Sequence, residues 1–77
     1  MNDIDEAAIE RFLDNAQLHA QAKNDWAEGF WLGRAVQHAD QNAVDHEWLT
    51  AEFEARGLDA AVIAIPKPGD ATGAHLN

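Results

Sequence analysis

The sequence predicts an all-α protein, a small three-helix bundle followed by a flexible C-terminal tail. Three observations lead to this class. Apolar residues recur at three- and four-residue spacing in three segments, as they do in amphipathic helices. Residues that can cap a helix precede each segment. The chain has 77 residues and no cysteine, and this length allows one domain at most. We expect that domain at residues 1–66 and the tail at residues 67–77.

The first helix is expected from about residue 3 to residue 22. At 100° per residue its apolar side chains form one stripe, made of Ile9, Phe12, Leu13, Ala16 and Ala20. The opposite face is polar and includes Glu6, Glu10 and Asp14. Asp3 is a candidate N-cap, and Asn24 is a candidate left-handed residue at the end of the helix.

The second helix, residues 25–40, has no wide polar face. Asp25 and Glu28 form its expected capping pair. Large apolar side chains point to several sides, so this helix should be the central element of the bundle. Gly29 and Gly33 lie four residues apart on one side. The absence of a β-carbon there should let a neighbouring backbone approach closely.

The third helix is expected from Asn42 or residue 43 to residue 56, with Asn42 as its N-cap. Gly57 and Leu58 predict a Schellman motif at its end. Residues 60–65 allow two interpretations, a short fourth helix capped by Asp59 or a strand that ends at Pro66. A lone strand has no partner in this chain, which favours a short helix or turn.

Two of the three helices carry more apolar surface than one small core requires, which predicts a homodimer. The expected dimer-interface residues are Trp31, Val44, Trp48, Leu49 and Phe53.

Fourteen acidic residues against five basic ones give a formal net charge of −9. Direct binding of nucleic acid requires a basic face, and the five basic residues are scattered, so we expect none. The excess of acid serves solubility alone or steers the chain toward a basic protein. In the second case the protein would inhibit a nucleic-acid-binding protein as a decoy, by analogy in charge and size with small acidic proteins of phages and mobile elements.

The N-terminus lacks the pattern of a signal peptide, and the longest apolar run, residues 60–65, is too short to cross a bilayer. The sequence therefore predicts a cytoplasmic protein without membrane contact.

Two sets of residues are candidates for binding a partner protein. Trp31, Arg34 and His38 share one helical face, and Trp and Arg are enriched in interface hot spots. The second set is the acidic face of the first helix, at Glu6, Glu10 and Asp14. The simpler interpretation places Trp31 in the core, with the arginine passing beside it and the acids solvated.

Residues suited to catalysis are few. The chain has no cysteine, serine or tyrosine, no HEXXH pattern and no phosphate-binding loop. We therefore expect neither an enzyme nor a cofactor. The alternative is a small metal- or ligand-binding domain that uses His38, His46 and nearby carboxylates. The last of the four histidines of the chain, His75, lies in the expected tail.

Overall fold

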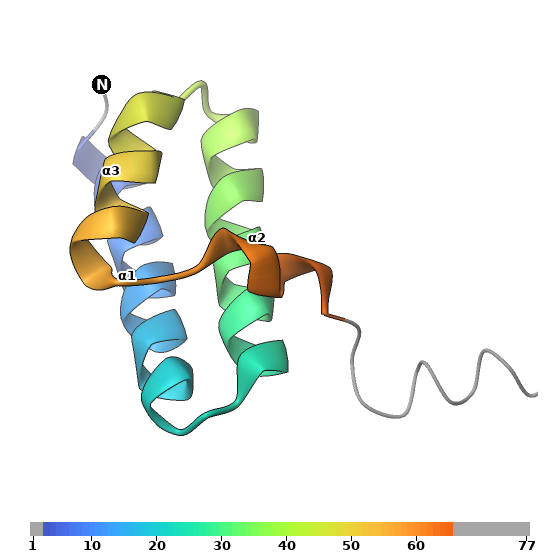
Figure 1. Cartoon of the computed structure of the whole chain (residues 1–77). Coiled ribbons are helices and arrows are strands. Elements are labelled where there is room, and N and C mark those ends of the chain that lie inside the picture. Colours follow the sequence, from blue (N-terminus) through green and yellow to red (C-terminus); the bar gives the residue numbers. More distant parts are fainter. Residues whose placement is uncertain (1–2, 66–77) are drawn as a thin grey trace, which may run out of the picture.

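A computed structural model describes residues 3–65 of the chain. It contains three α-helices, α1 (Asp3–Gln21), α2 (Asp25–Gln41) and α3 (His46–Arg56), and a 3₁₀ helix, η1 (Ala60–Ala64). Helices α1 and α2 run antiparallel, α3 folds back over α1, and η1 crosses α2 (Figure 1). The predicted all-α class is confirmed. The expected tail, residues 67–77, lies outside the described residues.

The apolar stripe of α1 forms the central part of the core, as predicted. Ile9, Leu13 and Ala16 are completely buried, and Phe12 and Ala20 pack against the core while remaining partly exposed. Burial of such side chains supplies the main favourable contribution to folding.

In the turn between α1 and α2, the left-handed residue and the N-cap of α2 are not the residues that the sequence predicted. Lys23, not Asn24, takes the left-handed conformation, with φ of 62°. The backbone N–H of Asn24 then donates to the carbonyl of His19 at 2.9 Å and closes α1. The side chain of Asn24 accepts from the backbone N–H of Ala27 at 3.1 Å. Asn24 is therefore the N-cap of α2, and the predicted cap, Asp25, is the first helical residue.

The predicted start of the third helix at Asn42 is also wrong. The side-chain amide of Asn42 donates to the carbonyl of His38 at 2.9 Å, so this residue ends α2. Ala43 follows with φ of 56°, which no helix can continue. Asp45 then caps α3 by accepting from the backbone N–H of Glu47 at 2.9 Å.

The end of α3 matches the predicted Schellman motif. Gly57 is left-handed, with φ of 69°, and its N–H donates to the carbonyl of Glu54 at 3.1 Å. The N–H of Leu58 donates to the carbonyl of Phe53 at 2.9 Å. The chain then turns toward α2, where Asp59 caps η1 by accepting from the N–H of residue 61. The helical alternative for residues 60–65 is thus the correct one, in 3₁₀ form.

Helix α2 contacts α1, α3 and η1, and is the central element that the sequence predicts. Gly29 is buried directly beneath the backbone of η1, where a β-carbon would collide with the carbonyl group of Val62. The predicted close approach of a backbone is therefore confirmed, and the neighbour is the 3₁₀ helix. Gly33 is less constrained, since a β-carbon there would lie 3.7 Å from the side chain of Ile63.

The sequence predicted that Glu28 forms a capping pair with Asp25. In the structure Glu28 is buried instead. Its side chain accepts a hydrogen bond from the backbone N–H of Asp59, directly before η1. Burial raises the pKa of the Glu28 carboxyl, the hydrogen bond lowers it, and the charges of Asp25 and Asp59 raise it; the net change is upward. Glu28 and Gly29 together determine where η1 lies on α2.

Candidate functional site

Three residues of α2 that the sequence predicted to bind a partner, Trp31, Arg34 and His38, contact Phe12 of α1. The indole of Trp31 stacks on its ring, with centroids 6.0 Å apart and an interplanar angle of 25°. The imidazole of His38 meets the ring edge-on at 6.0 Å. The guanidinium carbon of Arg34 lies 5.5 Å from the ring centroid. We call these four residues the Phe12 cluster.

The cluster continues along α2 through two further rings. Phe30, which is 43% exposed, lies edge-on to Trp31 at 5.2 Å and contacts Trp26 at 5.8 Å. The guanidinium of Arg34 lies 5.8 Å from the centroid of Phe30. Arg34 shares a helical face with Trp31, but the rings that its guanidinium covers are those of Phe12 and Phe30. Both contacts fall within the range of cation–π attraction.

A hydrogen bond to Asp5 fixes the imidazole at one edge of the cluster. His38 Nε2 lies 3.0 Å from Asp5 Oδ1, and both side chains are mostly buried, at 25% and 17% exposure. This pair joins the first turns of α1 to the last turns of α2. Because Asp5 occupies one ring nitrogen, the orientation of the imidazole is set by α1.

A small cavity of about 130 Å³ lies on the outer side of the Phe12 cluster. Its lining consists of the ring of Phe12 and four polar side chains, Arg34, Gln37, His38 and Gln41. The α2 residues are spaced at three, four and seven positions, which places them on one face of the helix. No carboxylate lines this cavity.

The acidic face of α1 lies on a different flank. Glu10 and Asp14 are exposed and Glu6 is half-exposed. Glu10 and Phe12 are two residues apart, so their side chains leave α1 about 160° from each other. The structure therefore divides the six predicted partner-binding residues into two separate surfaces, an acidic row (Glu6, Glu10 and Asp14) and the Phe12 cluster.

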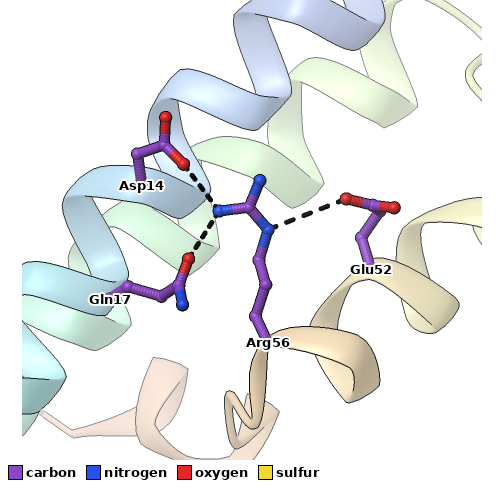
Figure 2. A network of polar contacts seen from close by, with 4 residues as sticks. All are labelled: Asp14, Gln17, Glu52 and Arg56. Atoms are coloured by element: carbon purple, nitrogen blue, oxygen red, sulfur yellow. Dashed lines mark hydrogen bonds and ion pairs between the residues drawn. The ribbon is translucent and has the colours of Figure 1, made fainter.

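Within the acidic row, Asp14 is already engaged. Arg56 of α3 donates through Nη1 to Asp14 Oδ1 and to Gln17 Oε1, both at 2.7 Å (Figure 2). Its Nε lies 3.7 Å from Glu52 Oε1. This arginine is mostly buried, at 18% exposure. It links the end of α3 to the middle of α1. Glu6 and Glu10, the other two members of the row, form no ion pair with another described residue.

The five predicted dimer-interface residues do not form a surface. Val44, Leu49 and Phe53 are 3%, 4% and 7% exposed and belong to the core of the single chain. Trp31 and Trp48 are half-buried and pack against that core. Val44 moves inward because α3 begins after it, so it belongs to the loop that closes over the core. Among residues 3–65, the large apolar side chains that do remain exposed are Ile4, Leu18, Phe30, Ile63 and Ile65.

The two histidines of the metal-binding alternative are engaged separately. His38 pairs with Asp5, and His46 Nε2 lies 2.7 Å from Asp40 Oδ1 at an exposed position. Between residues 3 and 65, no group of three or more histidine, aspartate and glutamate side chains is placed to hold a metal ion. His75 lies outside this range.

Within the same range, none of the helices is both long and apolar enough to cross a membrane. The chain matches no protein-family model, no curated protein and no solved structure. The fold and the two surfaces define a small all-α protein. Its acidic row and its Phe12 cluster, which contains Arg34, are separate surfaces.

The sequence does not by itself assign three residues to the Phe12 cluster and its cavity. Phe12 lies at the edge of the apolar stripe of α1, which indicates a core residue. The spacing of Gln37 and Gln41 from Arg34 and His38 is the signal that places them on the same helical face. Only the packing of α1 on α2 shows that the stripe ends at this surface.

Proposed function

We propose that the chain is a non-enzymatic, cytoplasmic interaction module that binds a basic protein through the acidic row of α1. The observation that carries this proposal is that Glu6 and Glu10 lie one helical turn apart and form no ion pair with a cation of the described residues. An unpaired carboxylate on the surface is available to a lysine or arginine of a partner.

The charge of the whole surface supports the same partner class. Among residues 3–65, Glu28 is buried and the Asp5 side chain is 17% exposed, so the other acids contribute most to the surface potential. Among the arginines and lysines of residues 3–65, Arg56 forms ion pairs with acids, and it is shared between Asp14 and Glu52. The uncompensated negative charge would attract a basic protein and repel an acidic one.

In its more specific form the proposal is that the row acts as a decoy. Consecutive members of the row rise about 6 Å along the helix axis, and Asp14 lies next in order after Glu10. A nucleic-acid-binding protein carries a basic track that neutralises phosphates, and a line of carboxylates would compete for that track. The module would then inhibit such a protein.

The test compares two double charge reversals that change net charge equally. Glu6→Lys with Glu10→Lys alters the acidic row and leaves the Asp14–Arg56 pair intact. Glu47→Lys with Glu54→Lys is the matched control, since these two exposed acids of α3 also have no ion pair among residues 3–65. Each chain is used to capture partners from the source cell, and the affinity of the captured protein is then measured.

We expect the row reversal to weaken binding by about tenfold or more, equivalent to about 1.4 kcal/mol, and the control to weaken it much less. Binding of the unaltered chain should also fall steeply as salt rises, since ions screen exposed charges beyond about 10 Å at 0.1 M. Equal effects of the two reversals, or an affinity indifferent to salt, would contradict a role for the row and leave the acid as a determinant of solubility.

A further inference from the structure

We propose that the cavity beside the Phe12 cluster binds a carboxylate group, with Arg34 as its counter-ion. This site is separate from the acidic row and has the opposite charge preference, so it goes beyond the function proposed above. Its ligand is the side chain of an aspartate or glutamate, or the C-terminal carboxylate of a polypeptide, supplied by a partner protein or by a second copy of this chain.

Two aromatic rings hold the guanidinium of Arg34, at 5.5 Å and 5.8 Å from their centroids. Within residues 3–65 it forms no ion pair, whereas Arg56 engages two carboxylates. In a chain with a formal net charge of −9, an arginine fixed away from the surrounding acids keeps its N–H donors free for an external acceptor. A planar carboxylate matches the geometry of those donors.

Hydrogen-bond donors line the cavity beside Arg34. Gln37 and Gln41 follow Arg34 on the same face of α2 and bring amide N–H groups to the rim. The Nε2 of His38 is already engaged with Asp5 at 3.0 Å, so the imidazole forms a wall of the cavity and is not a donor to the ligand. The aromatic floor excludes water from one side of the ligand. Arg34 and the two amides together favour an anion over a cation.

The cavity has room for a small group. Its volume is about 130 Å³, and one water molecule requires about 10–15 Å³ measured in the same way. A carboxylate with its adjoining methylene therefore fits the space.

The experiment titrates the full chain with small carboxylates at constant ionic strength. N-acetylglutamate α-amide represents an acidic side chain, N-acetylglycine represents a chain terminus, and N-acetylglutamine α-amide is the neutral isostere. The signals followed are the NMR resonances of the Arg34 Nε–H and of the Gln37 and Gln41 side-chain amides, and tryptophan fluorescence. We expect saturable changes with a Kd on the order of 1–10 mM, as for a single charged contact, and none with the neutral isostere.

Two arginine variants decide whether the cavity is responsible. Arg34→Gln should abolish saturation, and Arg11→Gln, which removes the same charge from an exposed position on α1, should preserve it. Circular dichroism checks that both variants fold. Should Arg34→Gln fail to fold, Gln37→Glu provides a second test, because an acid at the rim should occupy Arg34 and weaken binding at least tenfold.

Equal responses to the charged and neutral probes, or saturation that survives Arg34→Gln, would overturn the proposal. A dilution series without added ligand separates the two sources of the carboxylate. Concentration-dependent shifts at the same resonances would identify a second copy as the donor, and their absence with saturable probe binding would assign the donor to a partner protein. Because no partner is needed in these titrations, their failure is distinct from failure of the acidic row to bind a basic protein.

Discussion

Gly29 of α2 lies directly under the carbonyl group of Val62 in η1. A β-carbon built on this glycine would collide with the carbonyl oxygen and lie 2.7 Å from the carbonyl carbon. Backbone atoms of two elements occupy this contact, so neither a rotamer change nor a small shift of one side chain could relieve it. The position of the 3₁₀ helix on α2 therefore depends on the absence of a single methyl group.

The first prediction follows from that contact. Gly29→Ala should displace η1 and lower the free energy of unfolding, even though alanine raises helix propensity by about 1 kcal/mol. Gly33→Ala is the matched control on the same helix, since its β-carbon would make an ordinary 3.7 Å contact with Ile63. That variant should be neutral or more stable. Urea unfolding measures both, and equal stabilisation of the two would contradict the close approach.

The second prediction concerns Glu28. Its pKa is raised by burial above the ordinary value of 4.5, so the folded state binds more protons than the unfolded state between that value and the raised one. The free energy of unfolding should therefore fall as pH rises through this window. Glu28→Gln can still accept the N–H of Asp59 without a charge, and should be more stable than the unaltered chain at pH 7.

The advantage of Glu28→Gln should shrink as the pH is lowered toward 4.5, because the folded carboxyl takes up protons before the unfolded one does. Denaturant unfolding at several pH values provides the measurement. The control is Glu54→Gln, which alters an exposed carboxylate of α3 and should change stability by less than about 0.5 kcal/mol at each pH. A constant difference across the range would show that ionisation of Glu28 does not affect folding.

The third prediction concerns the left-handed residue Ala43. A non-glycine residue in this conformation costs about 1–2 kcal/mol, and its φ is 56°. Ala43→Gly should therefore raise the free energy of unfolding by roughly 0.5–1 kcal/mol, since the greater freedom of glycine in the unfolded chain cancels part of the gain.

The opposite change at Gly57 is the matched control for Ala43→Gly. No atom lies within 4 Å of a β-carbon built on Gly57, and its φ is +69°. Gly57→Ala therefore introduces the backbone cost without a steric clash, and should destabilise the chain by about 1 kcal/mol. Thermal unfolding of both variants checks the pair, and a loss of stability in Ala43→Gly would contradict the argument.

The fourth prediction is the homodimer that the sequence suggests. Sedimentation at micromolar concentration should report about twice 8.4 kDa. Three of the residues first expected at the interface are buried in the single chain, so the contact would have to use exposed apolar side chains such as Leu18 or Phe30. If one of these two side chains forms the contact, its replacement by glutamine should lower the measured mass toward 8.4 kDa, and replacement of the other should not. A single species of 8.4 kDa throughout would exclude this assembly.

The sequence by itself determined the fold class, the buried stripe of α1, the central place of α2 and the Schellman motif at Gly57. These features depend on local regularities, because helical spacing repeats along the chain and glycine adopts positive φ at little cost. The need for a close backbone approach at Gly29 was also apparent, although the approaching element was not.

Only the tertiary structure decided which side chains meet across elements. Asn24 and Asp25 compete for the same cap, and the choice depends on which nearby residue turns left-handed, here Lys23. The meeting of Phe12 with Arg34 depends on how α1 and α2 are rotated about their axes. Such rotations are set by the packing of the whole core, because many side chains must fill one volume together, and no spacing within a single helix records them.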